Sequence, residues 1–550
     1  MDDALTARYG DLLTGCYDCV DRIVVNAYHQ FAYSPGGFRT WWRLLHGSDD
    51  NLDNTHLMRM AGRFARRVRG WAKANDVPVI DTKAGERKHL IAEEYLATHS
   101  VGIGVFMVLV ARAPASVWKV TKSRTGVIVN LEKKREYVNH YSFHIRDPDW
   151  GHVTIKMSGH PPFGAMVMLN GHEYVACAAR AAGVDFVKES NCFTALTKPT
   201  RLAQIADTVS QPGAEGLLRE VCDRWIYTAC VCFGLDVDEQ QRSRFAYAYS
   251  VYQAEYSHNL LFTDGARMQR IFDTIVDRTR SRLGVPLIRT LFGAKSRPHR
   301  NRKNGPPRLA AVIGTPRYDL TTFKVHFGRL TLKAYTKGEH VLRVEAIAHN
   351  TAELRCGRVL EHYSDITTRL RSMAEAFCTT LDCVDVSFIP DGLLDELPRA
   401  TTLGATRVGG IDMNQARIRN TIAAVLALAI APAGFTVSDL AAKVQTMTGQ
   451  TGDDYTVRQA AYDLRKLRGK QLVDRLGRTH RYHVPPDAAR TLAGLTALRD
   501  QVIAPILAGL RSPRQGRKPS SWTAIDRDYE QLRITIQKLF QDLAIDRAAA

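Results

Sequence analysis

The sequence lacks an apolar run long enough to cross a membrane. Its longest apolar stretches, Val101–Ala111 and Thr421–Ala431, are about half as long as the roughly 20 residues that span a bilayer. The first residues, MDDALTARYGD, are acidic and contain no apolar segment of the kind that a secretory signal needs. We therefore expect a cytoplasmic protein with no membrane partner.

Cysteine is sparse, with 10 residues among 550 at irregular spacings. This excludes a small fold held together by disulfides and favours reduced thiols. Cys16 and Cys19 form one CxxC pair, and Cys230 and Cys232 form one CxC pair. Because a structural zinc site usually needs a second pair at matching spacing, we interpret these residues as buried thiols.

The sequence motifs of nucleotide and acyl chemistry are also missing. The chain has no Walker A sequence, no Rossmann glycine signature after a strand and no Gly-x-Ser-x-Gly elbow. Nucleotide hydrolysis, dehydrogenase and α/β-hydrolase activities therefore have no support. We expect no nucleotide or flavin cofactor.

Acidic residues are the minority, since 75 Lys and Arg oppose 56 Asp and Glu and give a net charge of +19. Four segments together carry +26 and leave the rest of the chain at −7: 56–73, 278–308, 455–483 and 511–518. A solvated surface normally mixes both signs, whereas one-sign segments are typical of phosphate contacts. We therefore expect a nucleic-acid partner, with DNA favoured over RNA and the oligomeric state left open.

Two of these basic segments lie outside the C-terminal region. The candidate nucleic-acid contacts in them are Arg66, Arg67, Arg300, Arg302 and Lys303. The alternative for the second segment is a solvated linker, because Pro298, Gly305, Pro306 and Pro307 break its structure.

The pattern of elements predicts a multidomain α+β protein. We expect two mainly antiparallel β regions, 101–170 and 309–348, embedded in helices, and among these helices the aromatic stretch Phe245–Tyr256. The predicted domains are a helical N-terminal region with a basic helix (1–98), an α+β domain (99–295), a basic linker (296–308), a second α+β region (309–405), a C-terminal domain (411–510) and a basic helical tail (511–550).

The C-terminal domain has the clearest pattern. A long apolar helix, Ala416–Ala431, precedes a second helix with Ser438 as its N-cap. A third helix, Tyr455–Lys470, carries apolar residues on one side and basic residues on the other. It leads into a strand, a turn at Gly477 and another strand.

This order resembles a winged helix-turn-helix domain. The resemblance implies that the third helix enters a major groove and that the wing lies on the backbone or in the minor groove. The candidate nucleic-acid contacts are Arg458, Gln459, Tyr462, Arg465, Lys466, Arg468, Arg475, Arg478 and Arg481. The alternative is a winged helix that contacts protein.

The segment 333–345 (KAYTKGEHVLRVE) is the first candidate for catalysis. Its alternating residues share strand faces, so a hairpin would bring them together. The segment is similar to the Tyr-x-Lys…Leu-Arg-x-Glu pattern of some rolling-circle replication initiators, although the His-hydrophobe-His motif of the wider class is missing. The similarity implies Mg²⁺ or Mn²⁺ near a nucleophilic tyrosine. The candidate catalytic residues are Tyr335, Lys337, Arg343 and Glu345. The alternative is a solvated sheet face with cross-strand pairs.

Three further constellations are weaker candidates. His89 and Glu93 share a helix side, which fits a cation site or, preferably, a salt-bridged surface. The polar stretch 140–156 contains histidines, Asp147, Asp149 and Lys156, which suits either a metal-dependent nuclease or a turn. The tyrosines of 249–256 suit a nucleophile on a helix or, more simply, core packing.

The chain as a whole resembles an uncharacterised family of bacterial proteins, through the strings GERKHLIAEEYL, HYSFHIRDPDWGHVTIKM, MLNGHEYV and KAYTKGEHVLRVEAIAHN. The first hypothesis is a DNA-processing protein of a mobile element or plasmid, active in strand nicking, replication initiation or transposition. The alternative is a non-enzymatic transcriptional regulator or an RNA-binding scaffold.

Overall fold

The computed structural model describes residues 3–83, 86–282, 310–314, 322–327, 329–385, 389–390, 392–431, 434–449, 454–503, 527–528, 530–531 and 534–535. They fall into two compact units. The first takes the described residues up to Phe272 and those between Arg308 and Glu375. The second takes those from Ala376 onward, with Asp273–Arg282. The linker 296–308, the segment 511–518 and the residues Arg300, Arg302 and Lys303 lie outside the described residues.

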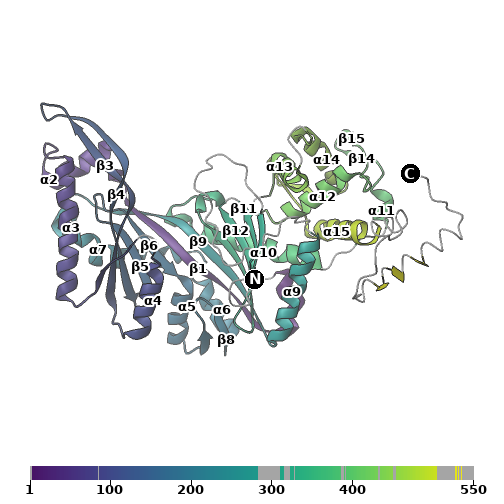
Figure 1. Cartoon of the computed structure of the whole chain (residues 1–550), viewed down its shortest axis with the longest axis horizontal. Coiled ribbons are helices and arrows are strands. Elements are labelled where there is room, and N and C mark those ends of the chain that lie inside the picture. Colours follow the sequence, from purple (N-terminus) through teal and green to yellow (C-terminus); the bar gives the residue numbers. More distant parts are fainter. Residues whose placement is uncertain are drawn as a thin grey trace, which may run out of the picture. The chain divides into compact units, whose positions relative to one another are not determined.

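One sheet dominates the first unit (Figure 1). Among the described residues it has 11 strands in the order β10-β11-β12-β13-β9-β1-β6-β5-β4-β3-β2. Only the short β2–β3 pair is parallel within it. The strands are β1 (Leu13–His29), β2 (Val79–Asp81), β3 (Gly104–Lys122), β4 (Ile128–Asp147), β5 (Gly151–Ser158), β6 (Ala165–Asn170), β9 (Tyr247–Phe262), β10 (Ala310–Gly314), β11 (Thr322–Phe327), β12 (Leu330–Lys337) and β13 (Val341–Ala348).

Helices make up most of the N-terminal region, but it also contains a long strand that the sequence-based expectation did not include. Residues Leu13–His29 form the long strand β1 at the middle of the sheet. Its dense run of β-branched residues, Val20 to Val25, fits a strand that is covered on both faces and has no helical period.

The aromatic stretch Phe245–Tyr256 is also a strand rather than a helix. It belongs to β9, in which Tyr247, Tyr249 and Val251 alternate with partly exposed residues. Because β9 pairs with β13, the two predicted β regions join in a single sheet. The helical nucleophile suggested for these tyrosines is therefore wrong.

Helices cover the sheet of the first unit. They are α1 (Ala4–Tyr9), α2 (Pro35–His46), α3 (Asn54–Ala74), α4 (Lys88–Thr98), α5 (Gly171–Ala181), α6 (Pro199–Asp207), α7 (Ala214–Ala229), α8 (Val237–Arg242), α9 (Gly265–Arg282) and α10 (Tyr363–Asp385), the last two of which begin here. A separate hairpin joins β7 (Phe186–Lys188) and β8 (Phe193–Leu196).

The two faces of the sheet differ in character. One face carries Tyr141, Phe143 and Ile155, and Phe64 of α3 packs on Tyr141 with ring centroids 4.8 Å apart. We call this the apolar face. The opposite face, called the polar face, carries His140, Ser142 and His144 on β4 and continues through the register to β9 and β13. The candidate catalytic residues Tyr335, Arg343 and Glu345 lie on the polar face.

The second unit is mostly helical. Its elements are α11 (Leu393–Glu396), β14 (Thr401–Leu403), β15 (Thr406–Val408), α12 (Ala416–Leu428), α13 (Val437–Thr448), α14 (Val457–Gly469), β16 (Asp474–Arg475), β17 (Tyr482–His483) and α15 (Pro486–Ala497), followed by a π-helical turn, Leu498–Ile503. An isolated antiparallel bridge pairs Phe435, just before α13, with Tyr482 of the β16–β17 hairpin. Buried Ile422, Leu440 and Leu464 contribute to a core from α12, α13 and α14.

The start of α13 differs from the prediction. Thr436 rather than Ser438 is the N-cap, and Asp439 completes a capping box with it. Ser438 is the second residue of the helix. Thr436 satisfies the preference for a hydroxyl at the cap, so the sequence pattern was shifted by two residues.

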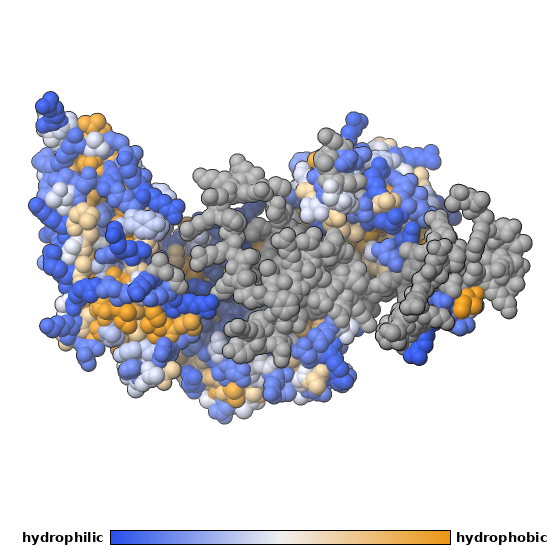
Figure 2. Space-filling view, viewed as in Figure 1, coloured by the Kyte–Doolittle hydropathy of each residue, from blue (hydrophilic) through white to orange (hydrophobic). Residues whose placement is uncertain are grey.

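Figure 2 shows mainly hydrophilic residues on the face that it presents, with smaller hydrophobic areas between them. No helix within the described residues is both long enough and apolar enough for a membrane span.

Candidate functional site

Helix α14 exposes a basic side in the second unit. Arg458 and Arg465 are exposed on it, and Tyr462 lies between them with 45 % of its surface accessible. The ion pairs found among the described residues include neither arginine. The positive charges of this side are therefore available to an outside partner.

Three other predicted contacts of α14 have partners within the chain. Gln459 forms a capping box with Thr456, whose backbone N–H it receives at 2.7 Å. Lys466 is buried, with its amine 5.1 Å from the centre of the Tyr462 ring. Arg468 lies over Tyr482 of the hairpin at 5.5 Å. Fewer side chains of this helix are thus available to an outside partner than its sequence indicates.

The β16–β17 hairpin adds further basic groups. Arg478 is exposed at its turn, which Gly477 permits by adopting a positive φ of 55°. Arg475 donates to the carbonyl of Thr479, and Arg481 donates to the carbonyl of Gly434 at 2.9 Å. The first bond stabilises the turn of the hairpin, and the second joins the hairpin to the segment before α13.

Helix α3 is also basic in sequence, but the fold pairs three of its six basic side chains with carboxylates. Arg63 contacts Glu239 at 2.7 Å, Arg67 contacts Asp236 at 3.7 Å and Arg69 contacts Asp81 at 2.9 Å. Of the two predicted contacts in this helix, Arg66 is exposed and Arg67 is paired. Because the carboxylates come from distant segments, the basic run could not reveal them.

The four predicted catalytic residues lie together on the polar face. Tyr335 of β12 is directly opposite Arg343 of β13, and Lys333 is opposite Glu345. The Tyr335 hydroxyl donates to Glu345 at 2.6 Å, and the Lys333 amine contacts the other carboxylate oxygen at 3.0 Å. The hairpin expected from the alternation is therefore present.

Arg343 is the centre of this cluster. It is fully buried, contacts Asp21 of β1 and lies 2.9 Å from Glu345. Although burial opposes both charged forms, the ion pairs raise the pKa of Arg343 and lower that of Asp21 to about 2. Two carboxylates and two cations, Arg343 and Lys333, thus balance within the cluster.

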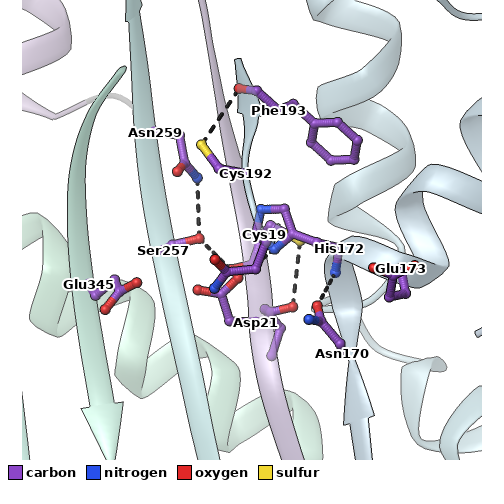
Figure 3. Close-up of polar contacts among 12 residues, drawn as sticks. Cys19, Asp21, Asn170, His172, Glu173, Cys192, Phe193, Ser257, Asn259 and Glu345 are labelled. Carbon is purple, nitrogen blue, oxygen red and sulfur yellow. Dashed lines mark hydrogen bonds and ion pairs between the residues drawn. The ribbon is translucent and has the colours of Figure 1, made fainter. Parts of the chain in front are cut away.

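Sequence analysis missed the residues that cover this cluster. His172 of α5 faces Asp21, and Asn191, just before β8, contacts Arg343 through its carbonyl and Lys337 through its side chain. Burial lowers the pKa of His172, so its ring is neutral. Figure 3 shows Asp21, His172 and Glu345 from separate elements, beside the Asn259–Ser257–Cys19 hydrogen bonds. The charged residues Asp18, Asp21 and Arg22 within an otherwise apolar stretch were the sequence feature that could have indicated Asp21.

Burial and ion pairing limit the chemistry that this cluster can perform. Burial, together with Glu345, raises the pKa of the Tyr335 hydroxyl, so its nucleophilic form is disfavoured. Burial also lowers the pKa of the Lys337 amine. The Arg343 guanidinium contacts both Asp21 and Glu345, so these carboxylates do not fit a divalent cation in this arrangement. Among the residues that the structure describes, no group of His, Cys, Asp and Glu is placed to hold a metal ion.

The structure also places residues of the remaining constellations. His89 and Glu93 are exposed on α4. Asp147 is buried and receives hydrogen bonds from Arg224 and Trp225, both at 2.7 Å. This explains the Asp-Pro-Asp turn as an anchor for α7 and leaves no acid beside Lys156.

A buried histidine missed by the sequence analysis lies on the apolar face of β9. His258 contacts Asp18 at 2.6 Å and Asp3 at 2.9 Å. Burial opposes its charged form, but the two carboxylates raise its pKa to about 9. The trio therefore holds an imidazolium near neutral pH and ties α1 to the middle of the sheet.

A comparison of the chain with protein-family models, with curated proteins and with solved structures finds no match.

Proposed function

We propose that the protein binds nucleic acid, with α14 and the β16–β17 hairpin as a winged-helix reader of duplex DNA. The observation that carries this proposal is that Arg458 and Arg465 on α14 and Arg478 at the hairpin turn are all exposed. Three helices followed by a short hairpin give the order of elements that a winged helix has, and the Phe435–Tyr482 bridge joins the hairpin to the segment before α13.

The physical basis is counterion release. Each phosphate that an arginine neutralises frees condensed counterions, so affinity depends on the charges that face outward. Arg458 lies in the first turn of α14, where base contacts of such helices arise, and Arg465 lies two turns further along the same side. Arg478 at the hairpin turn is placed to contact the backbone.

The test is DNA binding by full-length protein at several salt concentrations. The double variant Arg458→Ala, Arg465→Ala should weaken binding to a mixed-sequence duplex and reduce the salt slope by about 2. Arg66→Ala on α3 is the matched control, because it also removes an exposed helical arginine. Unchanged affinity in the double variant would assign this surface to protein contacts.

The same titration separates DNA from RNA. A major-groove helix reads B-form DNA, whereas the major groove of A-form RNA is too deep and narrow for side chains to read. Equal affinity for duplex DNA and duplex RNA of the same sequence would favour an RNA-binding scaffold over a DNA regulator.

A second candidate function is strand nicking by the cluster around Tyr335. The observation in its favour is that Tyr335, Lys337, Arg343 and Glu345, predicted from a short pattern, come together in space. Nicking with Mg²⁺ or Mn²⁺ requires Arg343 to release Glu345, so it needs a rearrangement of the cluster. Incubation with supercoiled plasmid and either cation tests it: cleavage that Tyr335→Phe abolishes would support nicking, and binding without cleavage would exclude it.

A further inference from the structure

A group of basic side chains lies on the polar face, apart from the Arg343 cluster. We call it the basic cluster, and it consists of Lys88, His140, His144, His152 and Lys156. The β4–β5 register places Lys156 opposite Ser142, so it shares a face with the histidines on either side. Helix α4, which begins at Lys88, packs on the same face through Ile91 and Tyr95 against a cluster of Phe106, Met107 and Leu109.

The two lysines of this cluster have no counter-ion. Both are partly buried, and they lie close enough for the charge of Lys156 to act on Lys88. Burial lowers the pKa of each amine. Within the described chain neither amine has a carboxylate partner; Glu173 acts on His152 but pairs with Lys188. Such an arrangement costs free energy unless an anion offsets it.

Two buried ring nitrogens of these histidines have no hydrogen-bond partner among the described residues. His144 is 3 % exposed and lies against His152, with Nδ1 3.0 Å from the facing Nε2. The other ring nitrogen of His144, Nε2, is buried and makes no hydrogen bond, and the same is true of Nε2 in His140. Buried polar atoms usually have partners, so these two indicate a group that completes the site.

We propose that the basic cluster binds a phosphate group. Two ammonium groups and the neighbouring imidazoles offer charge-assisted hydrogen bonds to phosphate oxygens, and the phosphate offsets the repulsion between Lys88 and Lys156. The polar face beside the cluster is partly exposed at Thr154, Met166 and Met168, which gives a ligand larger than phosphate room to extend. The phosphate belongs either to a small molecule or to a nucleic-acid strand. The inference is independent of the proposed contact through α14.

The first experiment measures inorganic phosphate binding and the melting temperature of the full chain. Lys156→Met should raise the melting temperature in phosphate-free buffer, because it removes one of two like charges. The same variant should abolish the rise that phosphate causes and weaken phosphate affinity by about tenfold or more. Lys88→Met should behave likewise, whereas Lys134→Met, an exposed lysine of β4 paired with Glu132, should match the wild type.

The opposite result has a clear meaning. If Lys156→Met lowers the melting temperature without phosphate and leaves phosphate affinity unchanged, the lysine is structural and the proposal is wrong. The proposal is also wrong if neither phosphate nor an oligonucleotide binds to the wild type.

A second experiment identifies the source of the phosphate. It uses full-length Arg458→Ala, Arg465→Ala protein, so that α14 contributes little to binding. Oligonucleotides with and without a 5′-phosphate compete with labelled inorganic phosphate. Competition by both assigns the site to a strand backbone, competition by the phosphorylated one alone assigns it to a strand end, and competition by neither assigns it to a small molecule.

Discussion

Helices α3 and α14 are both basic amphipathic helices, but they differ in how many of their arginines are paired with carboxylates. In α3, three arginines contact carboxylates from other segments, and Arg63 with Glu239 is the most buried of these pairs. In α14, Arg458 and Arg465 remain exposed, and no ion pair of the described residues involves them. Helix α3 thus pairs three of its arginines within the fold, whereas α14 keeps two arginines exposed.

The comparison teaches that a run of one-sign charge in a sequence is not yet a charged surface. The partners Glu239, Asp236 and Asp81 are between 12 and 176 residues from the arginines that they neutralise. Only the folded chain shows which basic segment keeps exposed positive charges that are not paired with carboxylates. A basic segment therefore predicts a nucleic-acid contact only after its distant carboxylates have been located.

The largest expected effect comes from breaking a pair in α3. Arg63→Met leaves the buried Glu239 carboxylate with only the more distant and more exposed Arg242, 3.8 Å away, and should lower the free energy of unfolding by about 3 kcal/mol. Urea unfolding of the full chain measures it. The control Arg66→Met removes an exposed arginine one turn away and should change stability by less than about 0.5 kcal/mol. Equal effects of both variants would mean that the α3 pairs do not stabilise the fold.

A similar effect should follow from pH in the first unit. Because Asp18 and Asp3 raise the pKa of His258 to about 9, its contribution is fully present below pH ~6.5 and is lost as pH rises through ~9. Stability should therefore fall by about 2–3 kcal/mol over that range. Asp18→Asn should flatten this slope, whereas His362→Ala, at an exposed histidine, should leave it unchanged. A flat wild-type profile would contradict the charged trio.

The next effect concerns DNA binding and contrasts the helices directly. Reversing the charge of α14 with Arg458→Glu and Arg465→Glu should lower affinity for duplex DNA about 100-fold at moderate salt. Arg66→Glu with Arg67→Glu on α3 should lower it less than about threefold, because Arg67 is already paired with Asp236. Fluorescence anisotropy measures both. Comparable losses would show that α3 also contacts the nucleic acid.

The smallest effect tests the role of Gln459. Since its side chain caps α14, Gln459→Ala should lower the stability of the second unit by about 1 kcal/mol and leave the preference among DNA sequences unchanged. Hydrogen exchange in α14 peptides measures the stability, and competition with altered duplexes measures the preference. A changed sequence preference at unchanged stability would make Gln459 a base reader instead.

Much of the local structure follows from the sequence, because it depends on patterns a few residues long. Strands β6 and β13 begin and end at the residues that alternation and flanking turns indicate, Ala165–Asn170 and Val341–Ala348. Helix α14 follows from its apolar period in the same way. Strand β1 was mistaken for part of a helical region because a strand buried on both faces has no alternation to reveal it.

Of the cluster around Arg343, only the residues of the β12–β13 hairpin could be predicted from the sequence. Tyr335, Arg343 and Glu345 are near in sequence, and alternation places them on one face. Asp21 and His172 join them from more than 150 residues away, through the β1–β9–β13 register and the packing of α5. No short-range pattern contains that information.

The position of β1 also bears on how the chain reaches its folded state. Residues 13–29 leave the ribosome early, but one of their two neighbours, β9, ends at Phe262 and the other, β6, at Asn170. One edge of β1 therefore stays unpaired until more than 200 further residues have been synthesised. Long waits of this kind slow folding and expose strands to wrong pairing. Nascent chains that stall before β9 should accordingly be the species that aggregate or recruit chaperones.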